Sequence, residues 1–159
     1  AYEEPSQMGV DRWLAVVAGY LKYKEACCVI DCGSAITVDV VDAAGSHKGG
    51  YIIPGLSLMK KSLSAGTGRG RFDDEGEWGV TYGINTSECV RNGIAFMVSS
   101  FLDSLLRRLR LEGVSRLIVT GGDGEYVASL CTDDDVAIDV VLSSDLVFDG
   151  LSIMAELSC

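Results

Sequence analysis

The chain has 159 residues, of which 48% are hydrophobic, and its formal net charge is −10. This length fits one domain with a real core, and the hydrophobic content excludes a disordered chain. An acidic surface repels a phosphate backbone, which argues against a nucleic-acid partner. No apolar run approaches the roughly 20 residues of a membrane span, and the polar start shows no signal peptide, so we expect a cytoplasmic protein.

The first predicted element is a helix, because the apolar residues at positions 10, 13, 14, 17, 18 and 21 have helical spacing. Asp11 lies in its first turn, where a negative charge suits the helix dipole. Two strands follow at residues 26–31 and 35–42, and the break between them indicates a tight hairpin. A third strand is predicted at 47–55, and helical periodicity continues over 55–65.

The second half of the chain alternates between helices and strands. Residues 67–84 are rich in glycine and charge, which is typical of a long loop. The elements predicted after it are a long helix at 85–111, a strand at 115–120 that runs into a glycine turn, a short helix, a strand at 135–142 and a final helix at 144–157. The order predicts an α/β fold whose mixed sheet is flanked by helices, as in ribonuclease H-like proteins, although composition alone does not separate it from other α/β folds.

The hairpin lies within the stretch "VIDCGSAITVDVV" at residues 29–41. Gly33 permits a positive φ and close approach of the backbone. The turn N–H groups and the hydroxyl of Ser34 can bind phosphate oxygens, and Asp31 is an oxygen ligand for an accompanying cation. The alternative is an ordinary hairpin in which Asp31 and Ser34 satisfy the turn's own backbone.

Other polar residues are expected to have structural roles. The six cysteines form no Cys-x-x-Cys pair and His47 is the single histidine, so buried reduced thiols are expected instead of a zinc site. Asp39 and Asp42 are expected to face solvent at the end of their strand. The arginines at 107, 108 and 110 are expected on the wet face of the long helix.

Five short segments occur in a characteristic order: "MGVDRW", "VIDCGSAITVDVV", "GGYIIPGLSLM", "INTSECVRNGI" and "VTGGDGEYV". Together they resemble the type III pantothenate kinase family, which includes the Bvg accessory factor-like proteins, over nearly the whole chain. The resemblance implies one lobe of a two-lobed actin-like ATPase fold. It also implies transfer of the γ-phosphoryl group of ATP to pantothenate, the first step of coenzyme A synthesis, with Mg²⁺ and a monovalent cation such as K⁺ or NH₄⁺, in a homodimer.

The resemblance also assigns roles to residues near the start of the chain. The family's Gly-x-Asp-Arg motif falls on Gly9, Val10, Asp11 and Arg12, which makes Asp11 the general base and the motif a binding site for pantothenate. Tyr2 matches an upstream substrate contact. The residue types suit this chemistry, since a carboxylate can accept the proton of an alcohol and an arginine fork fits a carboxylate. Alternatively, Asp11 is no more than an acid at a helix start.

The remaining assignments concern the nucleotide, the cation and a further substrate contact. Asp31 matches the ligand of the monovalent cation, and Gly33 and Ser34 match the ATP contact, with serine where the family has threonine. The glycine turn near the adenosine falls on Gly121 and Gly122, although "TGGDG" also suits an ordinary strand-to-helix turn. Thr86 matches a substrate-contacting threonine, and capping the long helix is a compatible role.

The family's first hairpin, an Asp-x-Gly-Asn-[Ser/Thr] sequence, is not found in this chain. Residues 1–159 are therefore expected to form the C-terminal lobe, with the phosphate-binding N-terminal lobe absent. Three explanations stay open: a fragment of a full kinase, which the missing initiator methionine favours; one half of a split enzyme; or a non-catalytic, nucleotide- or pantothenate-binding regulatory relative. Intact Asp11, Arg12 and Asp31 argue against the third.

The long helix also predicts an assembly. Its apolar stripe includes Ile94, Ala95, Met97, Val98, Phe101, Leu102, Leu105, Leu106 and Leu109, which is wide for a helix with one charged face. A two-fold dimer would cover what the sheet does not. The resemblance implies the same arrangement, with Thr86 reaching the pantothenate site of the neighbour. The alternative cover is the missing lobe or the 67–84 loop.

Overall fold

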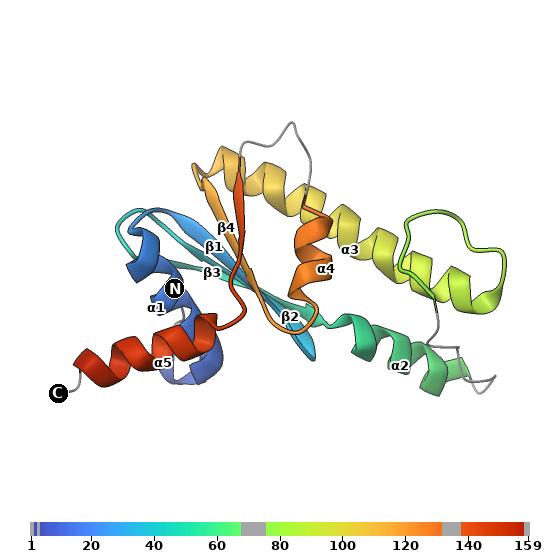
Figure 1. The fold of residues 1–159 in the computed structure, drawn as a ribbon, viewed down its shortest axis with the longest axis horizontal. Coiled ribbons are helices and arrows are strands. Elements are labelled where there is room, and N and C mark those ends of the chain that lie inside the picture. Colours follow the sequence, from blue (N-terminus) through green and yellow to red (C-terminus); the bar gives the residue numbers. More distant parts are fainter. Residues whose placement is uncertain (1, 3, 68–75, 132–137, 158–159) are drawn as a thin grey trace.

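The structure is a computed structural model, and it describes residues 2, 4–67, 76–131 and 138–157. The chain forms a five-stranded sheet, and Figure 1 shows helices on both of its faces. The strands are β1 (Cys27–Cys32), β2 (Ala35–Val41), β3 (His47–Pro54), β4 (Arg116–Thr120) and β5 (Asp139–Leu142). The helices are η1 (Pro5–Gln7, 3-10), α1 (Val10–Tyr23), α2 (Leu56–Thr67), α3 (Thr86–Leu111), α4 (Gly124–Ser129) and α5 (Leu146–Leu157).

The sheet is mixed, with the strand order β3-β2-β1-β4-β5. The first three strands form an antiparallel meander, while β4 and β5 run parallel to β1. Short turns suffice for the antiparallel pairs, whereas the parallel pairs need the helical crossovers α2–α3 and α4. The predicted ribonuclease H-like layout is therefore confirmed, and β1 lies at the centre of the sheet.

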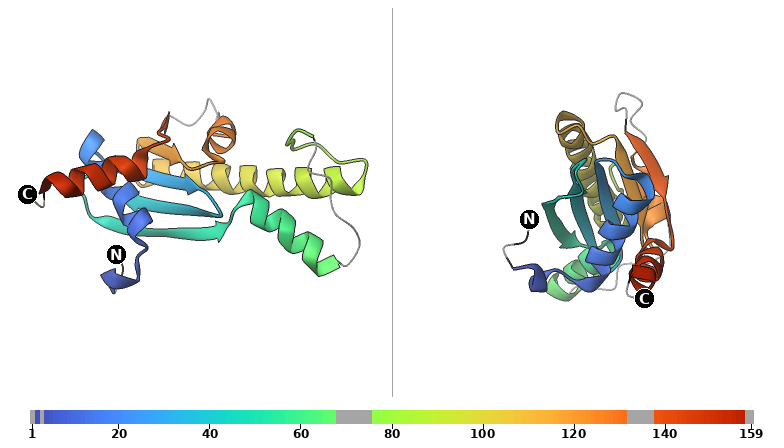
Figure 2. Two further views of the ribbon diagram at one scale, coloured as in Figure 1. Left: turned by 60° about the horizontal axis from the view of Figure 1, so that its bottom comes forward. Right: turned by 90° about the vertical axis from the view of Figure 1, so that its left-hand side faces the viewer.

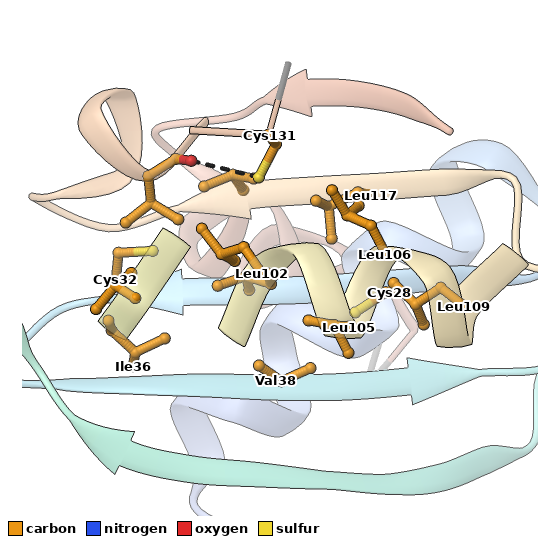
Figure 3. Packing of buried hydrophobic residues seen from close by; sticks show 14 of the residues in the cluster. Cys28, Cys32, Ile36, Val38, Leu102, Leu105, Leu106, Leu109, Leu117 and Cys131 are labelled. Carbon is orange, nitrogen blue, oxygen red and sulfur yellow. Dashed lines mark hydrogen bonds between the residues drawn. The ribbon is translucent and has the colours of Figure 1, made fainter. Parts of the chain in front are cut away.

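The side chains of β1 alternate between two cores. Cys28, Ile30 and Cys32 pack with α3 on one face, and Figure 3 shows the leucines of α3 that meet them. Cys27 and Val29 pack with α1 and α5 on the other face. Because the side-chain period of a strand is two, Asp31 continues the α1 face. Figure 2 shows the helices on opposite sides of the sheet.

Helix α1 is confirmed, but only part of its predicted apolar face is buried, including Leu14 and Ala18. Val10 and Trp13 are exposed, whereas the small residues Ala15 and Ala18 are almost fully buried. Small side chains allow the helix to lie close to the sheet, since they keep the two backbones near each other. The exposed apolar residues at the start of α1 therefore do not belong to the core of the described chain.

Helix α3 is confirmed within one residue, and it extends beyond the sheet together with α2 (Figures 1 and 2). Most of its predicted dimer stripe is instead buried in the core, which leaves Met97 exposed and Phe101 partly buried. The exposed arginines at 107, 108 and 110 match the prediction of a wet face. By length and composition alone α3 could span a membrane, but its buried leucines are typical of a core helix.

Some sequence predictions fall partly or wholly outside the described residues. This is true of residues 68–75 in the predicted loop, residues 135–137 in the predicted last strand, and Cys159. The remaining cysteines are free thiols, and four of them are buried as expected. The expectation is wrong for Cys89, which is exposed near the start of α3, where the helix has left the sheet.

Candidate functional site

The turn between β1 and β2 is formed by Gly33 and Ser34, both exposed. The N–H of Gly33 donates to the carbonyl of Ala35 at 3.0 Å, and the carbonyl of Ser34 accepts from the N–H of Gly55 at 3.0 Å. These bonds hold the turn without the Ser34 hydroxyl, which has no hydrogen bond within the described part of the chain. The alternative in which Ser34 satisfies the turn through its side chain is therefore wrong.

Gly33 does not have the conformation expected for it. Its φ is not positive, and an added Cβ would meet the carbonyl of Ala35 and the carboxylate of Asp31 only at ordinary distances of 3.9 and 4.0 Å. Neither backbone strain nor packing within the described chain requires glycine here. A side chain at position 33 would instead occupy the space outside the turn, where a ligand could approach.

Asp31 is half-buried beside this turn, and its pKa is raised, first by burial and then by the negative charge of Asp11. The interaction brings together two of the predicted site residues from β1 and from the start of α1. No cluster of three or more His, Cys, Asp or Glu that could hold a metal is found among the described residues. The result is a pair of neighbouring carboxylates, which a cation would stabilise.

Asp11 lies exposed in the first turn of α1. One carboxylate oxygen, Oδ1, accepts a hydrogen bond from the N–H of Arg12 at 2.8 Å. Asp11 therefore has access to solvent and a fixed orientation, which are two of the properties that a proton acceptor needs.

The glycine turn after β4 packs against Asp31. Gly121 has a φ of +91°, and an added Cβ would lie 2.6 Å from the carboxylate oxygen Oδ1 of Asp31 and from the backbone of Cys32. The N–H of Asp123 donates to the carbonyl of Cys32 at 3.0 Å. Because β1 and β4 are parallel neighbours, both of their carboxyl ends lie at the same edge of the sheet. A Cβ on Gly122 would meet nothing within 4 Å, so this side of the turn is open.

The guanidinium of Arg12 does not lie open to a ligand as a binding fork would. Its side chain is buried and donates from Nε and Nη2 to the two carboxylate oxygens of Asp39, at 2.9 and 2.6 Å. Its Nη1 donates to the hydroxyl of Tyr2 at 2.6 Å. The pKa of Arg12 is raised, chiefly by the hydrogen bond to Asp39. Tyr2 and Arg12 are thus adjacent.

The expectation that Asp39 faces solvent is wrong, since its residue is only 2% exposed. Its carboxylate oxygen Oδ1 also lies 2.8 Å from Nε2 of His47. Sequence reasoning missed both residues, although the alternation of β2 contains a signal. Asp39 is two residues from Val41, so it shares the face of the sheet that α1 covers. Asp42 does end the strand, where it accepts hydrogen bonds from Ala44 and Ser46.

Thr86 is not brought to this edge of the sheet. It is the exposed first residue of α3, at the end that projects beyond the sheet (Figure 1). Asn85 is the N-cap instead, because its side chain accepts from the N–H of Glu88 at 3.0 Å, while Glu88 accepts from the N–H of Ile84 at 3.0 Å. The suggestion that Thr86 caps the helix is therefore wrong, and its hydroxyl is left for another role.

Solved structures identify the class of fold. The chain resembles a Campylobacter jejuni protein described as a Baf family transcriptional activator, with a TM-score of 0.67 and 24% identity over 99% of this chain and 69% of that one. It also resembles the activator of a Clostridium difficile 2-hydroxyisocaproyl-CoA dehydratase with bound ADPNP, with a TM-score of 0.55 and 11% identity over 93% of this chain and 66% of that one. This is the fold of the actin-like ATPases.

The family follows from the sequence comparisons. The model of the family described as type III pantothenate kinase matches residues 1–108. A type III pantothenate kinase of Hahella chejuensis is 45% identical over 98% of this chain, and one of Marinobacter nauticus is 37% identical over 98%. The chain belongs to the type III pantothenate kinase family. It spans 62% of the length of each of these two relatives.

Proposed function

We propose that this chain forms the pantothenate-binding lobe of an enzyme that transfers the γ-phosphoryl group of ATP to pantothenate and so begins coenzyme A synthesis in the cytoplasm. The observation that carries the proposal is the meeting of Asp11, Asp31 and two glycine turns at one edge of the sheet. A binding protein has no chemical need for a second carboxylate beside Asp31. A kinase needs one, to accept a proton.

The carboxylate of Asp11 is the proton acceptor in this proposal. The primary hydroxyl of pantothenate attacks the γ-phosphorus, the bond from phosphorus to the β–γ bridging oxygen breaks, and ADP leaves. The hydroxyl proton passes to Asp11, whose orientation is fixed by the N–H of Arg12. Tyr2, Gly9, Val10 and Arg12 would hold the rest of pantothenate. Phosphoryl transfer depends mainly on positioning and charge stabilisation, so few protein groups are required.

The nucleotide would lie along the two turns. Gly33 leaves open space at the first turn, and Ser34 has a hydroxyl that can donate to a phosphate oxygen. Gly121 is required by its own conformation, while Gly122 presents an open backbone on which adenosine could lie. Other phosphate contacts would come from a first lobe, located either elsewhere in the same polypeptide or in a separate chain. The lengths of the relatives support this proposal.

The half-buried carboxylate of Asp31 would suit a monovalent cation, because burial and the negative charge of Asp11 both raise its pKa. K⁺ or NH₄⁺ there would supply positive charge beside the phosphates. Mg²⁺ would bind through few carboxylates together with the phosphate oxygens of ATP and water.

We also propose that the active form is a homodimer in which α3 brings Thr86 to the pantothenate site of the partner. Residues around Thr86 support this arrangement, because Tyr82, Ile84, Phe96 and Met97 are all more than half exposed. A groove of about 640 Å³ lies between the loop and the helix, lined in part by Val80, Tyr82 and Phe96. Apolar surface gathered in this way is typical of an interface.

The test uses the complete protein, with both lobes, and measures ADP release with and without pantothenate, together with the mass of the product. We expect pantothenate-dependent ADP release, a product heavier by one phosphoryl group, and a large loss of activity when sodium replaces potassium. ADP release that ignores pantothenate would refute the substrate. Turnover that ignores the choice of monovalent ion would refute the role of Asp31 alone.

A further inference from the structure

The buried guanidinium of Arg12 lies in a closed polar cluster that the proposed chemistry does not explain. Four side chains form it, from four separate segments: Tyr2 near the chain start, Arg12 in α1, Asp39 in β2 and His47 in β3. Asp39 occupies the Nε and one Nη2 hydrogen of Arg12, so the two-pronged face that a carboxylate prefers is already used. The Arg12–Asp39 pair also has no net charge.

His47 enters the cluster because of an irregularity in the sheet. The pairing of β2 with β3 shifts between Val40 and Val41, so that Val41 lies opposite His47 and Lys48 is the additional residue. Opposed residues of antiparallel strands share a face, and a regular pairing would have placed Lys48 there. The bulge therefore turns His47 towards the α1 face, where the ring of His47 is partly buried beside Asp39.

The hydrogen-bond roles within the cluster follow from the carboxylate. Asp39 only accepts, so Nε2 of His47 donates to Oδ1 at 2.8 Å, the same oxygen that accepts from Arg12. This third bond fixes Asp39 against rotation, and Asp39 in turn fixes the guanidinium. His47 also stacks against Tyr2, with ring centroids 6.0 Å apart and planes inclined by 21°.

Tyr2 is the member of the cluster that can act outwards. Its oxygen accepts from Nη1 of Arg12, which leaves its own hydroxyl proton to donate to another group. The guanidinium also lies over the tyrosine ring, 5.6 Å from its centroid. The contacts that orient Tyr2 within the described chain thus come from Arg12 and His47.

We propose that Asp39 and His47 are positioning residues of the pantothenate site, which orient Tyr2 through Arg12 and through ring stacking so that its hydroxyl can donate to an oxygen of the substrate. The inference rests on the proposed function. It also changes the expected role of Arg12, which holds Tyr2 and offers at most its remaining N–H groups to the substrate. Neither Asp39 nor His47 need touch pantothenate.

The experiment is a double-mutant cycle in the complete protein, with KM for pantothenate, KM for ATP and kcat measured for each variant. His47→Ala and Tyr2→Phe are each expected to raise KM for pantothenate about tenfold, the effect of losing one oriented hydrogen bond. KM for ATP and kcat should change less than threefold. Because His47 acts through Tyr2, His47→Ala made in the Tyr2→Phe protein should raise KM further by less than twofold.

Two further variants separate the contributions of the ring. His47→Gln keeps an N–H donor for Asp39, and His47→Phe keeps a ring for Tyr2, so each should restore part of the affinity lost in His47→Ala. Lys48→Ala is the matched control, since that neighbouring side chain is exposed and is expected to leave KM unchanged. Thermal melting of every variant confirms that it is folded at the assay temperature.

The outcomes separate the inference from the function on which it rests. An active wild type with an unchanged KM in His47→Ala would overturn the positioning role alone. So would equal effects of His47→Ala in the presence and absence of the Tyr2 hydroxyl, because additivity would mean that His47 does not act through Tyr2. A wild type that neither binds nor phosphorylates pantothenate would overturn both proposals.

Discussion

Two acidic residues on the same face of the sheet have opposite surroundings. Asp31, in β1, has the carboxylate of Asp11 as a charged neighbour, and its pKa is raised. Asp39, in the adjacent β2, accepts hydrogen bonds from Arg12 and His47. No positively charged group contributes to the pKa shift of Asp31, whereas both carboxylate oxygens of Asp39 accept hydrogen bonds. The first arrangement is typical of a site that a ligand completes, and the second of a part that holds such a site in place.

The largest effect on activity is expected at Asp11, the neighbour of Asp31. Asp11→Asn should lower kcat by roughly 10²–10⁴, the usual range for loss of a general base, because the amide cannot take the hydroxyl proton. Binding of pantothenate should change by less than about tenfold, since the amide oxygen can still accept from the N–H of Arg12. Turnover by a coupled ADP assay and affinity by calorimetry measure the two quantities. Near-wild-type turnover would remove Asp11 from the mechanism.

The second prediction concerns whether a second copy of the chain completes the pantothenate site. Phe96→Glu should convert a dimer into a monomer and raise KM for pantothenate, because a charge in an apolar interface is strongly unfavourable and Thr86 would be withdrawn. Leu111→Glu is the control, since Leu111 is also an exposed apolar residue of α3 but lies at the opposite end of the helix. Sedimentation velocity at micromolar concentration measures the assembly. A monomeric wild type with tight pantothenate binding would contradict the dimer.

A third prediction contrasts the glycines of the two turns. Gly121→Ala should lower the free energy of unfolding by about 1–2 kcal/mol for the left-handed conformation alone, and by more because its Cβ meets Asp31 and Cys32. Gly33→Ala should leave stability within about 1 kcal/mol, since its φ and its space both accept a methyl group. Its effect should instead be a higher KM for ATP. Urea unfolding and ATP kinetics test the two variants. An unchanged KM for ATP in Gly33→Ala would mean that ATP does not approach the turn at Gly33.

Much of the fold could be predicted from the sequence, because periodicity and turn residues are local signals. The α-β-β-β order, the long helix and the meander all follow from such signals. The roles of Asp11 and Asp31 followed only from the family resemblance. Their nearness could not be predicted from spacing, because the packing of α1 on the sheet brings the two residues together.

The polar cluster could not be predicted for a related reason. An aspartate near a strand end is usually solvated, and Asp39 is buried only because Arg12 from another element meets it there. The position of His47 depends on a one-residue bulge, which has no reliable sequence signal. The dimer stripe was overestimated on α3 because the width of an apolar stripe does not reveal how much of it the sheet covers.

The most direct test of the contrast between Asp31 and Asp39 is the melting temperature of Asp31→Asn and Asp39→Asn, measured side by side without potassium or ATP. Asp31→Asn should raise Tm by a few degrees, because it removes a charge that burial and Asp11 both disfavour. Asp39→Asn should lower Tm by roughly 6–20 °C, since breaking a buried pair costs about 3–5 kcal/mol. Changes of opposite sign are the predicted result. A fall in Tm for both variants would contradict the claim that the charge of Asp31 is uncompensated without a ligand, while that of Asp39 is compensated by Arg12.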